Sequence, residues 1–226
     1  MVPRLLAVPA TLALLAALAG CGSDDGSDTA SDPTSPESSP TGPTTTCDYP
    51  DGGAASKEVS APDTEAPASG EVAVTLTTSV GEIGATLDAE AAPCTVNSFT
   101  SLAGQGYFDG TTCHRLTTAG IFVLQCGDPS ASGSGGPGYS FADELSGDET
   151  YPAGTLAMAN AGPDTNGSQF FVVYDDTELP PSYTVFGTID DAGLETVRQV
   201  AEDGTADGGP DGAPATEVAI ESVSVG

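Results

Sequence analysis

The sequence predicts a mainly β fold for residues 71–226, an antiparallel barrel with two helices. Short segments of alternating or compact apolar residues recur through this region, and such segments are typical of strands. Only two segments show the three- and four-residue apolar spacing of a helix. These helices do not alternate regularly with strands, so a parallel βαβ sheet is not expected.

The region opens with a predicted hairpin. Residues 72–78 alternate apolar and polar side chains, residues 80–83 supply a turn, and a return strand continues through Leu87. Residues 216–225 alternate in the same way, so we expect them to form the last strand.

Helices are expected at residues 92–103 and 192–202. Thr95 is a candidate N-cap of the first, because a threonine hydroxyl can accept a hydrogen bond from a free backbone N–H. The residues at helical spacing are Val96, Phe99, Leu102 and Ala103 in the first segment, and Leu194, Val197, Val200 and Ala201 in the second.

Residues 1–20 have the pattern of an export signal, with a cation at Arg4, an apolar run and a small-residue exit. The run is shorter than the roughly 20 residues of a typical membrane span. Leu18-Ala-Gly-Cys21 resembles the lipobox of bacterial lipoproteins, which implies cleavage before Cys21 and a lipid on its side chain. An uncleaved anchor helix and an ordinary secretory signal are the alternatives. We expect an extracytoplasmic protein, lipid-anchored at the outer face of the cell membrane.

Two segments separate the signal from the predicted domain. Residues 21–46 contain mostly Ser, Thr, Asp, Pro and Gly, so they cannot bury enough apolar surface to offset the entropy of ordering them. We expect them to form a disordered acidic tether. Residues 47–70 are interpreted as an arm that leads into the domain.

The chain is strongly acidic, with a formal net charge of −29. After removal of the signal its cations are Lys57, Arg115 and Arg198. Nucleic acid is therefore an unsuitable partner, because phosphate binding depends on basic patches. Anionic lipid headgroups are equally unsuitable, so membrane attachment would depend on the lipid.

Besides Cys21, the chain has four cysteines, an even number that predicts two disulfides in an exported protein. They are Cys47, Cys94, Cys113 and Cys126, and three pairings are open. If Arg115 and Gln125 face the same side, strand alternation puts Cys113 on that side and Cys126 on the other. We therefore expect these two cysteines to pair elsewhere. A bond from Cys47 would attach the arm to the domain. A zinc site is disfavoured because paired C-x-x-C units are absent, and no metal is expected.

Three blocks resemble the active-site strands of cyclophilins, a family of peptidyl-prolyl isomerases. They are Cys113-His-Arg115, Gln125-Cys-Gly-Asp128 and the long block from Met158 to Phe171. The resemblance extends from about Glu71 to the C-terminus. It implies a closed eight-stranded antiparallel barrel, a helix at each end, and substrate bound on the outer face of one sheet.

The resemblance also implies a site for proline peptides. Arg115 would donate a hydrogen bond that weakens amide resonance, with a surface ion pair as the alternative interpretation of this arginine. Gln125 and Gln169 would bind substrate or hold the arginine, and the backbone of Asn160 would contact substrate. The residues of the implied proline pocket are Phe122, Val123, Phe171, Leu179 and Tyr183. Ala159 and Ala161 would line the neighbouring groove.

Three departures from the family pattern stand out. Two additional residues lie between Arg115 and Phe122, an even number that can preserve strand facing. Glu178 occupies the position of the family's tryptophan, and Tyr183 that of its pocket histidine. Weak inhibition by cyclosporin is the prediction, because that tryptophan contacts the drug.

We expect a monomeric isomerase without a cofactor, acting on X-Pro bonds in unfolded or flexible proline-containing polypeptides and assisting the folding of exported proteins. The alternative is a non-catalytic proline-peptide-binding module or chaperone in the cell envelope. His114 is interpreted as structural, since isomerisation transfers no proton. Asp203, Asp207 and Asp211 are interpreted as a solvated loop, because their spacing does not fit a calcium-binding EF-hand.

Overall fold

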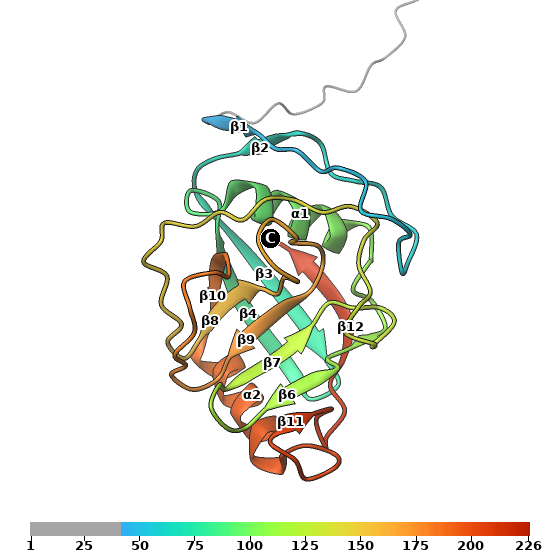
Figure 1. Cartoon of the computed structure of the whole chain (residues 1–226), viewed down its shortest axis with the longest axis vertical. Helices are drawn as coiled ribbons and strands as arrows, with labels where there is room; N and C mark the ends of the chain where they lie inside the picture. The colour runs from blue at the N-terminus through green and yellow to red at the C-terminus, as the bar shows by residue number, and fades with distance from the viewer. Residues whose placement is uncertain (1–41) are drawn as a thin grey trace, which may run out of the picture. The chain divides into compact units, whose positions relative to one another are not determined.

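The computed structural model describes residues 42–226, shown in colour in Figure 1. The predicted signal peptide at residues 1–20, the predicted lipid attachment at Cys21 and the tether up to residue 41 lie outside this range. Within it, no helix has the length and apolar character needed to cross a membrane.

Ten segments form one antiparallel sheet, in the order β11-β6-β7-β9-β8-β10-β4-β3-β12-β5. The sheet curls around a core, and helices α1 and α2 lie at opposite ends of it (Figure 1). The predicted fold class is confirmed: a mainly β, curled antiparallel sheet with two helices. The strands are β3 (Glu71–Thr78), β4 (Gly81–Asp88), β5 (Thr111–Thr112), β6 (Arg115–Thr117), β7 (Val123–Cys126), β8 (Thr155–Met158), β9 (Phe170–Val173), β10 (Val185–Ile189), β11 (Asp211–Gly212) and β12 (Ala219–Val225).

Two residues join the far ends of this sheet. β5 is the last strand in the sheet order and β6 the second, yet only Cys113 and His114 separate them in sequence. The Cys113 N–H donates to the carbonyl of Val218 at 2.9 Å, and the next N–H, of His114, donates to the carbonyl of Gln125 at 3.1 Å. The segment Cys113-His114 therefore connects the two ends of the curled sheet, where β5 and β6 are not paired with each other.

The expected separate pairing of Cys113 and Cys126 is wrong. The disulfides are Cys113–Cys126 and Cys47–Cys94. Side-chain alternation applies only within a regular strand, and β6 begins at Arg115, after Cys113 has crossed between strands. Both cysteines of this pair are buried in the main core, with their Cα atoms 4.0 Å apart.

The Cys47–Cys94 disulfide attaches the arm to α1, as expected of a bond from Cys47. Residues 44–46, which the sequence assigns to the tether, form a strand. Strand β1 (Thr44–Thr46) pairs with β2 (Glu65–Pro67), and the Thr46 hydroxyl donates to the Glu65 carboxylate at 2.9 Å. The buried neighbours Cys47 and Ala66 anchor this small sheet, so its polar composition does not leave it disordered.

Helix α1 spans Pro93–Gly104 and α2 spans Asp191–Asp203, both close to the expected ranges. Thr95 is not the N-cap of α1, because that position is Ala92, which has no capping side chain. The Glu144 carboxylate takes the role instead. It accepts hydrogen bonds from the Cys94 and Thr95 N–H groups, both at 2.8 Å, and from the Thr95 hydroxyl at 2.7 Å. In α2 the cap is local, since the Asp190 carboxylate accepts from the Gly193 N–H at 2.6 Å.

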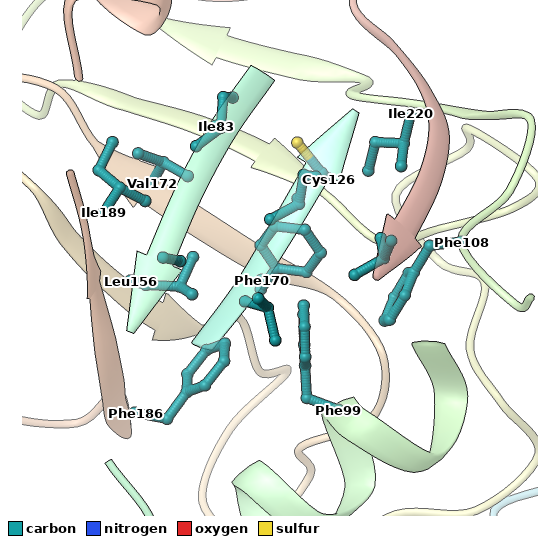
Figure 2. Packing of buried hydrophobic residues seen from close by; sticks show 14 of the residues in the cluster. Ile83, Phe99, Phe108, Cys126, Leu156, Phe170, Val172, Phe186, Ile189 and Ile220 are labelled. Atoms are coloured by element: carbon teal, nitrogen blue, oxygen red, sulfur yellow. The ribbon is translucent and has the colours of Figure 1, made fainter. Parts of the chain in front are cut away.

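The main core lies between the inner face of the sheet and α1. Phe99 points from α1 toward Phe170 of β9, with ring centroids 5.4 Å apart (Figure 2). Phe186 lies beside this pair, and Phe108 closes the other side. Because alternate residues of β7, β8 and β9 face this core, their other residues face outward.

Removal of the Glu144 carboxylate should destabilise the fold. We expect Glu144→Ala to lower the free energy of unfolding by about 1–2 kcal/mol, the range of a lost N-terminal cap and its charge. Urea denaturation followed by circular dichroism measures the change. Glu90→Ala removes the same charge from an exposed side chain that makes no hydrogen bond to residues 42–226, and should have little effect. Equal effects of the two variants would contradict the capping role.

Candidate active site

The outer face of β7, β8 and β9 carries a second hydrophobic cluster, separate from the main core. Val123, Ala157, Phe171 and Val173 are buried there, together with Tyr151. The register pairs Val123 with Val173 and Gln125 with Phe171, so apolar and polar residues of one face lie side by side. Arg115 of β6 pairs with Gln125, which places its side chain on this face.

This face contains a small hollow, here called the apolar pocket, with a volume of about 190 Å³. Most of the side chains expected at the site line it, and they combine apolar groups with the polar side chains of Arg115, Gln125 and Asn160. The lining residues are Arg115, Ile121, Val123, Gln125, Ala159, Asn160, Phe171, Leu179 and Tyr183.

The structure corrects the expectation for Phe122. Its ring packs edge-on against Tyr174, with centroids 5.9 Å apart, and it belongs with the main core instead of the apolar pocket. Val123 and Ile121 lie two residues apart and share a face, which leaves Phe122 between them on the other face. Ile121, which sequence reasoning missed, lines the pocket.

Tyr151 is a second residue that sequence reasoning missed. Its hydroxyl accepts a hydrogen bond from the Tyr183 N–H at 3.1 Å, and it lies 3.2 Å from the Pro180 carbonyl. The Tyr183 ring packs edge-on against Phe171, with centroids 5.6 Å apart. Tyr151 therefore holds the segment that contributes Leu179 and Tyr183 to the pocket, and no sequence signal links it to residues about 30 positions downstream.

A chain of side-chain hydrogen bonds connects the polar residues of the site. Arg115 Nη1 donates to Gln125 Oε1 at 3.2 Å, and Gln125 Nε2 donates to Gln169 Oε1 at 2.8 Å. Gln169 Nε2 then donates to the Gly135 carbonyl at 2.9 Å. Each amide is oriented by its neighbour, so Gln125 presents its carbonyl oxygen to the arginine.

Asp211 holds the other side of the Arg115 guanidinium. Nε donates to Oδ1 at 2.8 Å and Nη2 donates to Oδ2 at 2.7 Å. The hydrogen bonds raise the pKa of Arg115 and lower the pKa of Asp211. The arginine thus forms the ion pair considered as an alternative and lines the pocket as well. The prediction of a solvated loop is wrong for Asp211, which lies in β11, and β11 pairs with β6.

A larger groove of about 430 Å³ lies next to the apolar pocket. Ala159, Ala161 and Gln169 are among its lining residues. The glycine-rich residues 133–140 also line the groove, together with Gly52 and Ala54 of the arm. No charged side chain lines the groove, so polar contacts there come from backbone, amide and hydroxyl groups.

Asp128 organises the glycine-rich side of this groove. Its carboxylate accepts hydrogen bonds from the N–H groups of Ser130, Gly133 and Gly135, at 2.7–3.0 Å. Burial alone would raise the pKa of Asp128, but the hydrogen bonds from Ser130, Gly135 and Gly133 outweigh it and lower that pKa to about 2. Asp128 therefore stays ionised and fixes the carbonyl of Gly135 that receives Gln169.

His114 precedes Arg115 in the sequence and is partly buried. Burial lowers the pKa of His114, so the ring is neutral at pH 7, as a structural histidine would be. Neither ring nitrogen of His114 has a hydrogen-bond partner among residues 42–226. In the same range, no cluster of three or more His, Cys, Asp or Glu side chains is placed to hold a metal.

Comparison with protein families identifies a match over residues 73–225. The matching family is the cyclophilin-type peptidyl-prolyl cis-trans isomerase/CLD family. The chain is 57% identical over 166 residues to the probable peptidyl-prolyl cis-trans isomerase B of Mycobacterium tuberculosis, covering 68% of this chain and 54% of that protein. It thus spans about half the length of this relative. It is 46% identical over 114 residues to isomerase B of Bacillus subtilis, covering 50% of this chain and 78% of the relative.

Solved structures agree with this match. A cyclophilin-type isomerase of Cryptosporidium parvum superimposes with a TM-score of 0.61 and 29% identity, over 70% of this chain and 98% of that one. Its crystal structure in the presence of the dipeptide Ala-Pro gives a TM-score of 0.60 at 30% identity, over 68% and 98% of the two chains.

The Asp128 carboxylate should stabilise the fold in a pH-dependent way. We expect Asp128→Asn to lower the free energy of unfolding by about 2 kcal/mol at neutral pH. Because the pKa is 3.8 for an unperturbed aspartate and about 2 in the fold, this contribution is complete above pH 3.8 and is lost as the pH falls toward 2. Unfolding curves at several pH values measure it, with exposed Asp148→Asn as the control. A difference between wild type and variant that persists at pH 2 would contradict the assignment.

Proposed function

The chain belongs to the cyclophilin-type peptidyl-prolyl cis-trans isomerase family, and on that premise we propose that it accelerates the cis–trans isomerisation of X-Pro peptide bonds. One observation carries the proposal: Arg115 lines the same apolar pocket as Val123, Phe171, Leu179 and Tyr183. A pocket for a proline ring is thereby combined with a strong hydrogen-bond donor.

The mechanism requires no covalent intermediate. Rotation about a peptide bond has a barrier of about 18–20 kcal/mol, because resonance gives the C–N bond double-bond character. With the proline ring in the apolar pocket, an Arg115 N–H would donate to the proline nitrogen and localise its lone pair there. This interaction is stronger in the twisted transition state than in the planar ground state, so it lowers the barrier.

Substrates of this site are proposed to be proline-containing unfolded or flexible polypeptides. The crystal structure of the Cryptosporidium parvum relative with Ala-Pro supports a ligand of this kind. Residues before the proline would extend into the neighbouring groove, which Asn160 and Gln169 line. No cofactor is needed for this chemistry, and weak inhibition by cyclosporin stays a prediction.

The protein is proposed to act outside the cytoplasm on exported clients, as a monomer anchored through a lipid on Cys21. The two disulfides among the described residues support an oxidising compartment. The Leu18-Ala-Gly-Cys21 motif supports lipid attachment, and the net charge of −29 argues against nucleic acid or anionic headgroups as partners.

A non-catalytic proline-peptide-binding module is the second candidate. It is favoured by the double hydrogen bond between Arg115 and Asp211, which occupies part of the donor that catalysis would use. Such a module would keep the apolar pocket and the groove without accelerating isomerisation.

Removal of the guanidinium should distinguish these candidates. We expect Arg115→Ala to lower kcat/KM by one to two orders of magnitude, about 1.4–2.7 kcal/mol of transition-state stabilisation. A protease-coupled assay with an Ala-Pro-Phe peptide and the full chain measures this change. Arg198→Ala is the matched control, since Arg198 donates to the Tyr174 carbonyl and does not line the apolar pocket. If the folded wild-type protein binds the peptide but does not accelerate its isomerisation, the isomerase proposal is overturned and the binding module is supported.

Lipid attachment has its own test. We expect mass spectrometry of the mature protein to find Cys21 as the first residue, carrying a diacylglyceryl group, and Cys21→Ser to leave the membrane fraction. A mature N-terminus at another residue, or membrane association that survives Cys21→Ser, would contradict the lipoprotein proposal.

A further inference from the structure

We propose that Asp211 is a positioning residue that holds the Arg115 guanidinium with its free N–H groups directed at the apolar pocket. The inference rests on the proposed isomerase activity. Asp211 does not line the pocket, so it would act on the reaction through Arg115 and not by touching substrate.

The donor count of the guanidinium supports this role. Arginine has five N–H donors in a rigid planar fork. Asp211 receives one from Nε and one from Nη2, and Gln125 receives one from Nη1. One N–H therefore remains on each of Nη1 and Nη2. Asp211 and Gln125 together fix the plane of the guanidinium, so the direction of both remaining N–H donors is set before substrate binds.

Asp211 is itself held by the backbone that carries Arg115. β11 pairs antiparallel with β6, with Asp211 opposite Thr117 and Gly212 opposite Leu116. The Thr118 N–H donates to the Pro210 carbonyl at 2.9 Å, which extends this pairing. Asp211 and Arg115 thus lie on adjacent, paired strands of one sheet.

The turn before β11 is also ordered. Asp207 Oδ1 accepts from the Gly209 N–H at 2.9 Å and from the Thr205 hydroxyl at 3.0 Å. The Ala206 N–H donates to the Ala213 carbonyl at 2.8 Å, which closes the loop across its base. The position of Asp211 is therefore determined by the fold and not by its ion pair alone.

The ion pair is better suited to orienting the arginine than to stabilising the fold. The two side chains are 38% and 52% exposed, and exposed pairs contribute little to folding. A long arginine side chain that is 38% exposed otherwise samples many rotamers, and ordering it at the transition state costs entropy. Asp211 orders it in advance, which is the form of preorganisation that favours catalysis.

A double-mutant cycle in the full chain tests this role. We expect Asp211→Asn to lower kcat about fivefold while KM changes less than about twofold, since only the orientation of the donor is disturbed. On the Arg115→Ala background the same substitution should have no further effect. Asp203→Asn is the matched control, because its carboxylate accepts from the Thr216 hydroxyl in the same region and does not contact Arg115.

A spectroscopic readout accompanies the kinetics. In ¹H–¹⁵N spectra the Nε–H signal of Arg115, assigned by its absence in Arg115→Ala, should shift in Asp211→Asn and stay in place in Asp203→Asn. Circular dichroism and the urea midpoint should be unchanged by both substitutions, because the fold does not depend on this pair.

The outcomes separate the two proposals. A wild-type protein without acceleration overturns the isomerase proposal, and the positioning role with it. An active wild type whose kcat is unaffected by Asp211→Asn overturns the positioning role alone. An equal loss on the Arg115→Ala background also overturns it, because Asp211 would then act independently of the arginine.

Discussion

The side-chain alternation of β7, β8 and β9 is the constraint on which the site depends. Inward residues such as Phe170 and Val172 build the main core, while Val123, Phe171 and Val173 form the buried cluster on the outer face. Alternate residues of these strands therefore belong to two different apolar clusters, and a one-residue shift of register would move each set to the wrong face. This alternation puts Val123 and Phe171 of the pocket lining on the outer face, and Gln125 and Arg115 lie on the same face.

Two aspartates, Asp128 and Asp211, hold the polar residues of this face without lining the apolar pocket. Asp128 fixes the glycine-rich residues whose Gly135 carbonyl receives Gln169, and Asp211 fixes the far side of Arg115. Between them a continuous series of hydrogen bonds runs through the two glutamines. In a chain with a net charge of −29, acidic groups are abundant, and these two are used to hold neutral donors and a single cation in place.

Several features could be predicted because their signals are local. The alternation in β3, the helical spacing in α1 and α2, and the blocks around Arg115, Gln125 and Phe171 all lie within short stretches of sequence. These signals were sufficient for the mainly β fold and for most of the pocket lining. Phe122 was misplaced because the block shows which residues are near the pocket, whereas the facing of each depends on where the strand begins.

The sequence by itself determined the fold class, the identity of the arginine and glutamines, and the presence of four cysteines in the folded region. Only the tertiary structure decided which cysteines pair, that Glu144 caps α1, that Tyr151 supports Tyr183, and that Asp211 holds Arg115. Each of the last three contacts joins residues about 30 to 96 positions apart. Alternation and helical spacing extend over only a few residues, so such partners become neighbours through the folding of the whole sheet, and Cys113 meets Cys126 because the chain crosses between the ends of that sheet.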